Sequence, residues 1–170
     1  MPAKPVLAYR IKINSQPGGG VRILNQPAPA AFRESVKIGE QNLLSQAKSL
    51  IGDRDPREHE FTIQLRSMDA DKAGSGLGVA VLTALCGAVL GRNTRGATII
   101  VGVLNLGGSI DGLPNAVKIA ELAVEKQAQT LLLPVSARRQ LNDLPDDMWT
   151  KIGIEFHRDA TDAVFKALVD

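Results

Sequence analysis

The chain has 170 residues, of which 44% are hydrophobic, 22% are charged and only 4% are aromatic, and its formal net charge is +2. This length predicts one domain over residues 1–170, with a core built mainly from aliphatic side chains. A disulfide scaffold is excluded because Cys86 is the single cysteine. Cys86 and the two distant histidines, His59 and His157, cannot complete a zinc site, so we expect no metal in this domain.

The sequence shows no sign of a membrane span or a secretion signal. The apolar run at 77–90 is interrupted by glycine and threonine and is too short to cross a bilayer. The first residues carry no basic segment followed by an apolar one. Lysine and arginine are dispersed, whereas nucleic-acid-binding modules concentrate them on one stripe. We therefore expect a soluble, cytoplasmic protein, and the charge pattern alone does not support binding to DNA.

The first half of the chain predicts a strand hairpin, a helix and a further strand. Residues 6–13 alternate between apolar and polar, as a half-buried strand does, and after a glycine-rich turn residues 21–24 predict the returning strand. Residues 31–51 have apolar positions at helical spacing, and Gly52 is placed to end that helix. Alternation returns at 61–65, which predicts another strand.

The second half of the chain predicts helices that alternate with strands. A polar loop before Ser75 leads into a helix that ends near Leu90 and is apolar on nearly every side, so it should be buried. A strand covered on both faces is expected at 97–104, followed by a helix at 115–126 that begins beside Pro114 and Asn115. A strand at 130–133 is stopped by Pro134, and a short helix at 136–141 follows it. The last expected elements are a strand at 152–156 and a closing helix at 159–168, which Asp159 or Thr161 would cap. This order predicts an α/β or α+β sandwich.

The segment Gly74-Ser75-Gly76-Leu77-Gly78 is the first candidate for a functional site. A serine at the start of a helix lies near exposed backbone N–H groups and the positive end of the helix dipole, which favour an oxyanion. Serine is also a preferred N-cap residue and glycines permit close packing, so a purely structural role explains the same residues. The loop is not a nucleotide-binding P-loop, because no Gly-Lys-Ser/Thr follows at the required spacing.

Lys118, on the helix expected at 115–126, is the second candidate. A lysine acts as the general base for a serine only when burial keeps its amine neutral, and the apolar neighbours Val117 and Ile119 are compatible with burial. Glu121 follows three residues later, so a surface ion pair is the alternative.

Several phrases of the chain resemble one known family. Phe-Arg-Glu-Ser at 32–35 looks like the helix start before the active-site strand in the C-terminal proteolytic domain of Lon proteases. Residues 101–134 line up, without a gap, with the Lon segment from Thr-Gly-Glu to a strand-ending proline. The phrases at 74–80, 104–110 and 162–168 are closer still to one subgroup, the Lon-related protein of BREX phage-defence systems. The likeness covers most of the chain.

The resemblance implies the α+β fold of the Lon proteolytic domain, a sandwich also found in domain 2 of ribosomal protein S5. It also implies assembly as a homo-oligomeric ring, for which a hexamer is expected. In the BREX subgroup this domain follows an AAA+ ATPase, so the chain is expected to be excised from a longer AAA+ protein. ATP and Mg²⁺ would bind that other portion, this domain would hold no cofactor, and DNA would be contacted only through the rest of the chain.

Lon proteases cleave peptides with a Ser–Lys dyad, and this chain departs from their pattern at both positions. Aligned without gaps, the nucleophile position of the family falls on Gly76 rather than Ser75. The lysine position falls on Val117 rather than Lys118. Because one residue turns a helical side chain by about 100°, an offset of one aims the side chain away from the site.

Two hypotheses of different classes follow. The threonine and glutamate that Lon has near its site are Val101 and Val103 here, and the Lon-like domain of the DNA-repair protein RadA has this fold without peptidase activity. These points favour a degenerate, non-proteolytic module that assembles a ring. The alternative is an active ATP-dependent endopeptidase acting on protein substrates. In it Ser75 would be the nucleophile and Lys118 the base, and the backbone of Gly74 and Gly76 would serve the oxyanion.

Overall fold

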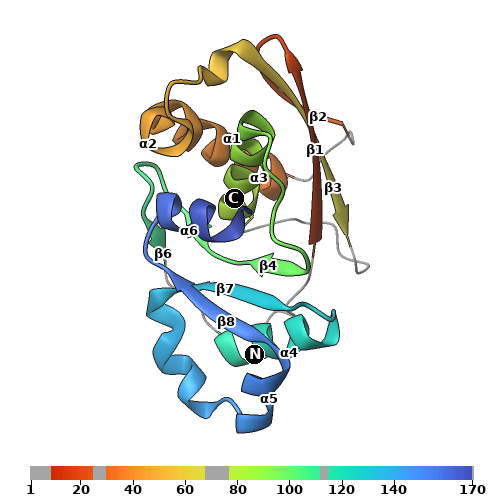
Figure 1. The fold of residues 1–170 in the computed structure, drawn as a ribbon, viewed down its shortest axis with the longest axis vertical. Helices are drawn as coiled ribbons and strands as arrows, with labels where there is room; N and C mark the ends of the chain where they lie inside the picture. The colour runs from red at the N-terminus through yellow and green to blue at the C-terminus, as the bar shows by residue number, and fades with distance from the viewer. Residues whose placement is uncertain (1–8, 25–29, 68–76, 112–114, 170) are drawn as a thin grey trace.

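The computed structural model describes residues 9–24, 30–67, 77–111 and 115–169, in which helices and small sheets form a mixed α/β fold (Figure 1). The strands are β1 Tyr9–Pro17, β2 Gly20–Ile23, β3 His59–Ser67, β4 Thr98–Ile100, β5 Val103–Leu104, β6 Ile110–Asp111, β7 Thr130–Pro134 and β8 Gly153–His157. The α-helices are α1 Ala30–Ser45, α2 Ala47–Ile51, α3 Gly78–Leu90, α4 Ala116–Glu125, α5 Asp146–Lys151 and α6 Ala160–Ala167. Two 3-10 helices are η1 Pro56–Glu58 and η2 Val135–Asp143.

The first sheet has the order β1–β3–β2, with β1 antiparallel and β2 parallel to β3. The expected hairpin between 6–13 and 21–24 is therefore wrong, because these two strands lie on opposite edges of β3 and do not pair with each other.

The chain crosses the beginning of β3 to pass from one edge to the other. Pro17, at the end of β1, lies opposite His59, and Gly20, at the start of β2, lies opposite Glu60. Gly20 has a φ of +89°, a backbone conformation that favours glycine. Strand β3 occupies the middle of the sheet, and its side chains Phe61 and Ile63 are almost wholly buried, at 2% and 0% exposure.

The second sheet is parallel and has the order β4–β7–β8. All of β7 is buried, and this strand ends at Pro134 as predicted. The strand expected at 97–104 is broken at Val101-Gly102 into β4 and β5, and β5 pairs with β6 in a separate antiparallel hairpin. A Cβ at Gly102 would lie 2.9 Å from Cγ2 of Ile110 and 3.1 Å from Cγ2 of Val79, so a side chain at this break would require its neighbours to shift. Because β4 lies at the sheet edge, it is half-buried rather than covered on both faces.

The helices follow the expected periodicity with two differences, of which one is that the short helix expected at 136–141 belongs to the 3-10 helix η2. The helix expected at 31–51 is divided at Gln46 into α1 and α2, and Gly52 ends α2 with a φ of +67°. Of the two predicted caps, Asp159 and Thr161, the structure has Asp159, which caps α6 by accepting a hydrogen bond from the backbone N–H of Asp162 at 2.9 Å. None of the helices in the described ranges is both long and apolar enough to cross a membrane.

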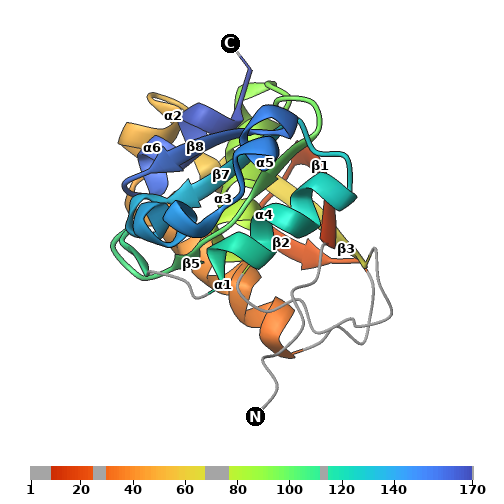
Figure 2. The same ribbon diagram turned by 90° about the horizontal axis from the view of Figure 1, so that it is seen from below.

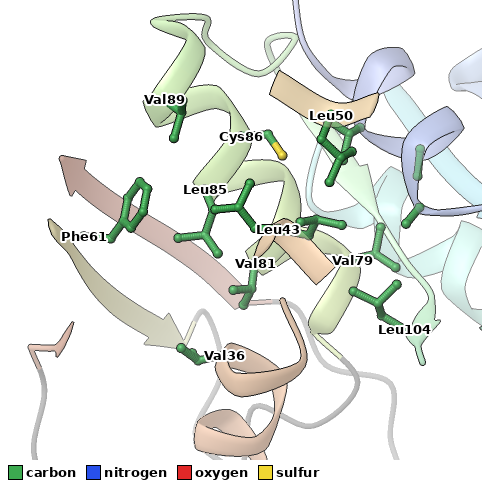
Figure 3. Packing of buried hydrophobic residues seen from close by; sticks show 14 of the residues in the cluster. Val36, Leu43, Leu50, Phe61, Val79, Val81, Leu85, Cys86, Val89 and Leu104 are labelled. Carbon is green, nitrogen blue, oxygen red and sulfur yellow. The ribbon is translucent and has the colours of Figure 1, made fainter. Parts of the chain in front are cut away.

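Buried side chains of the described residues form two cores. The first core lies between the β1–β3–β2 sheet and helices α1, α2, α3 and α6, and the second lies around β7 and β8 with α4, η2 and α5 (Figures 1 and 2). Figure 3 shows Val36 and Leu43 of α1, Phe61 of β3, and Val81 and Leu85 of α3 converging in the first core. As predicted, most of α3 is buried.

Helices α1 and α3 approach each other closely at Gly39. A Cβ at Gly39 would lie 2.8 Å from Cγ1 of Val81 and 3.3 Å from the backbone nitrogen of Leu82. These distances leave no room for a methyl group without a shift of one helix. The crossing of the two helices therefore requires glycine at this position of α1.

We predict that Gly39→Ala lowers the free energy of unfolding by about 1–2 kcal/mol, because overpacking at the crossing outweighs the better helix propensity of alanine. Urea unfolding followed by circular dichroism measures the change. Gly96→Ala is the matched control, since an added Cβ at this exposed glycine meets nothing within 4 Å. Equal stability of the two variants would contradict the close crossing.

Cys86 lies on α3 inside the first core, with no exposed surface (Figure 3). Burial raises the pKa of its thiol from 9.0 to about 12. The thiolate is the reactive form of cysteine, so Cys86 is an inert core residue, as its position in the apolar helix indicated.

We predict that Cys86 in the folded protein reacts with a thiol-specific disulfide reagent at pH 8 about a hundredfold or more slowly than in urea. Because this is the single cysteine of the chain, the whole signal reports on it. The protonated thiol stabilises the fold below pH 9.0, and this contribution is lost as the pH rises towards about 12. Rapid labelling of the native protein would show that α3 is accessible.

Candidate functional site

Val117 and Lys118 are among the described residues, whereas Ser75 and its neighbours Gly74 and Gly76 lie outside them. The described part of the candidate site consists of the residues around the start of α3, the helix that follows the glycine-serine segment in the chain.

The start of α3 is held by a hydrogen bond from α1. The backbone N–H of Leu77, the N-cap residue of α3, donates to Oγ of Ser35 at 3.2 Å. The Ser35 hydroxyl in turn donates to the carbonyl oxygen of Ala31 at 3.1 Å. Ser35 is buried, and its hydroxyl satisfies an N–H group that would otherwise lack a helical partner. The sequence pattern does not predict the hydrogen bond between Ser35 and Leu77, because these residues are 42 positions apart in the chain.

A cavity of about 190 Å³ lies beside the first turn of α3. It is lined by Ala31, Glu34, Ser35, Ile38, Gly78, Val103 and Leu104. A Cβ at Gly78 would lie 2.9 Å from Cβ of Leu104, so glycine is needed for α3 to start this close to β5. Among the described lining residues the polar groups are the Glu34 carboxylate and the Ser35 hydroxyl, and no lysine or histidine is present.

The resemblance implies that Val101 and Val103 stand where Lon has a threonine and a glutamate, and only Val103 lines this cavity. Val103 lines the cavity and is 43% exposed. Val101 is half-buried against the second core, and its backbone N–H donates to the carbonyl oxygen of Leu132 at 3.0 Å. Neither side chain can donate or accept a proton, so they supply no polar group to a reaction.

The buried side chain of His157 holds the backbone at Val101 through a hydrogen bond. The Nε2–H of His157 donates to the carbonyl oxygen of Val101 at 2.9 Å, while Nδ1 is buried without a hydrogen-bond partner among the described residues. Burial lowers the pKa of His157, so the ring is neutral near pH 7. A histidine at a strand end carries no motif, so this structural role was not visible from the sequence.

Helix α4 presents Val117 and Lys118 in different directions. Its buried face, which includes Ile119 and Ala120, packs in the second core, and Val117 is half-buried against the same core. Lys118 is exposed, and it is not among the residues that line the cavity. The one-residue step between Val117 and Lys118 thus separates a core position from a solvent position, as a turn of about 100° requires.

Helix α4 begins directly after Asn115, as predicted. Asn115 takes the N-cap position in a left-handed conformation, with φ of +66°, and its side chain makes no capping hydrogen bond. Instead, Oε1 of Gln140 accepts the backbone N–H of Ala116 at 2.9 Å. A distant side chain replaces the local cap because η2 packs against the beginning of α4.

A model of the Lon protease (S16) C-terminal proteolytic domain family matches residues 13–170. The chain is 23% identical over 161 residues to the Lon-like protease BrxL of Escherichia coli O9:H4 (strain HS), an alignment that covers 94% of this chain and 23% of that protein. It is 21% identical over 136 residues to the Lon-like protease BrxL of Bacillus cereus (strain H3081.97), which covers 80% of this chain and 20% of that protein.

A Lon protease is also similar. The chain is 27% identical over 161 residues to the Lon protease of Mycolicibacterium smegmatis, an alignment that covers 93% of this chain and 20% of that protein. The chain thus spans about a fifth of the length of the curated relatives it matches. The match over residues 13–170 confirms the resemblance seen in the sequence phrases: this chain belongs to the family of Lon protease C-terminal proteolytic domains.

Proposed function

We propose that the chain is the Lon-like C-terminal domain of a BREX-type phage-defence AAA+ protein, and that it assembles a ring rather than cleaving peptides. Two relatives named Lon-like protease BrxL, each aligned over most of this chain, support the first part. The second part rests on the placement of the candidate base.

The exposure of Lys118 is the observation that carries the non-proteolytic proposal. A lysine that accepts a proton from serine must be neutral, and an enzyme achieves this by burying the amine in apolar surroundings. Lys118 lies on the solvent face of α4, while the cavity is lined by α1, the start of α3 and β5. Turning Lys118 inward would rotate Ile119 and Ala120 out of the second core.

The valine pair supports the same proposal. A peptidase site needs groups that hold the dyad and stabilise charge in the transition state. Val101 and Val103 replace a hydroxyl and a carboxylate with hydrocarbon, which cannot orient a dyad.

The proposal extends to the larger protein. We place this domain, as a single S5-domain-2-like sandwich, at the end of a longer cytoplasmic chain whose AAA+ portion binds ATP and Mg²⁺. The domain itself needs no cofactor in this role. The ring is a homo-oligomer, with six copies expected, and DNA is contacted through the rest of the chain.

An ATP-dependent Ser–Lys endopeptidase that uses Ser75 and Lys118 is the second candidate. The cavity of about 190 Å³ beside the first turn of α3 favours it, because the volume suits one apolar side chain of a protein substrate.

We predict that the full-length protein, with ATP and Mg²⁺, does not cleave an unfolded protein such as casein, and that Ser75→Ala and Lys118→Ala leave phage restriction unchanged. A Lon protease of known activity is the positive control for cleavage, and ATP hydrolysis shows that each preparation is folded. Lys37→Ala, at another exposed helical lysine, is the matched control. ATP-dependent cleavage that both Ser75→Ala and Lys118→Ala abolish, but Lys37→Ala does not, would establish the endopeptidase instead.

A further inference from the structure

The one tryptophan of this aromatic-poor chain is exposed. The chain has only four phenylalanines, one tyrosine and one tryptophan, and Phe32 and Phe61 are used in the first core. Trp149, on α5, is 44% exposed. Tryptophan offers a large apolar surface and is enriched among the residues that dominate binding at protein interfaces.

Trp149 lies within an acidic group on α5 and the residues before it. We define the acidic patch as Asp143, Asp146, Asp147 and Trp149, all exposed. Asp147 makes an ion pair with Lys151 at 3.6 Å, whereas neither Asp143 nor Asp146 pairs with another described residue. Their charges are thus available to a partner.

A basic group lies on η2. We define the basic patch as Val135, Arg138 and Arg139, again all exposed. Arg139 makes no ion pair with another described residue. The guanidinium carbon of Arg138 lies 4.7 Å from the centre of the Phe156 ring, so this side chain is held against the protein.

Both patches stand on well-packed backbone. Ala137, Leu141 and Leu144 are buried in the second core and anchor η2 and the start of α5. In Figure 1, η2 descends on the left of the lower part of the molecule and α5 lies to its right. The basic patch lies on the first part of η2, whereas Asp143 ends η2 and the other residues of the acidic patch lie on α5. Because the second core anchors both elements, the loss of freedom on binding is small.

Resting on the proposed ring assembly, we propose that the acidic patch of one copy binds the basic patch of the next copy. The carboxylates of Asp143 and Asp146 face arginines across this contact, and the Trp149 ring covers the exposed Val135 side chain. Because two different patches meet, the contact is head-to-tail, and repetition produces a closed ring when the rotation between copies closes.

Cysteine cross-linking in the full-length protein tests the contact. Copies that carry Arg139→Cys are mixed with copies that carry Asp146→Cys and a different tag, and are oxidised with copper phenanthroline. We expect a cross-linked dimer that contains both tags and that is absent when either variant is oxidised alone. Cys86 does not interfere, because it is buried and its pKa is about 12, and the oxidation of each variant alone controls for cysteines in the rest of the full-length protein. Arg92→Cys, an exposed arginine after α3, replaces Arg139→Cys in the control and gives no dimer.

Charge reversal measures the energetic importance of the contact. We expect Arg139→Asp and Asp146→Arg each to raise the dissociation constant of the assembly about tenfold or more, and the double variant to restore it to within about threefold. Trp149→Ala weakens assembly similarly, while Phe165→Ala, at another exposed aromatic residue that is 48% exposed, does not. Sedimentation velocity measures these constants.

The outcomes separate this surface from the proposed function. Assembly without the mixed dimer overturns the surface and leaves the ring in place. A monomeric full-length protein overturns both. Peptide cleavage by a preparation that also gives the mixed dimer overturns the non-proteolytic role and leaves the surface in place.

Discussion

The burial of α3 is the constraint on which the first half of the structure depends. This helix is apolar on nearly every side, so the β1–β3–β2 sheet, α1 and α6 must cover it together. Covering a helix from several directions requires close approach, and glycine permits it: Gly39 lies against Val81, and a Cβ at Gly87 would lie 2.8 Å from the carbonyl oxygen of Arg92. The first core is therefore assembled around one helix.

The position of the candidate site follows from the same helix. Each buried leucine or valine contributes about 1.5–3 kcal/mol, whereas one hydrogen bond contributes about 1 kcal/mol. The place of α3 is thus decided by apolar burial, and the bond between Ser35 and Leu77 then orients its first turn. Gly78 brings this turn against Leu104, and the remaining space beside them is the cavity that Val103 lines.

The packing of the second core determines which side chains of α4, η2 and α5 are exposed to solvent. Its helix α4 buries a narrow stripe made mostly of alanine, and this stripe sets the rotation of the helix about its axis. The same rotation leaves Lys118 and Glu121 exposed, so the solvent position of the candidate base is a consequence of core packing. The core also anchors η2 and α5, which carry the exposed charges of the two patches and the exposed Trp149.

The sequence by itself determined the features that depend on neighbouring residues: the buried α3, the end of β7 at Pro134, a cap of α6 at Asp159 or Thr161, and the phrases that assign the family. The resemblance to that family also predicts that Lys118 lies one residue away from the family's lysine position. The six residues of α5 are too few to show a helical period, so no pattern predicted this helix. Only the tertiary structure decided that β3 separates β1 from β2, that the chain breaks at Gly102, and which way Lys118 faces. Strand order, close approach and helix rotation depend on contacts between residues far apart in the chain, which local periodicity does not encode.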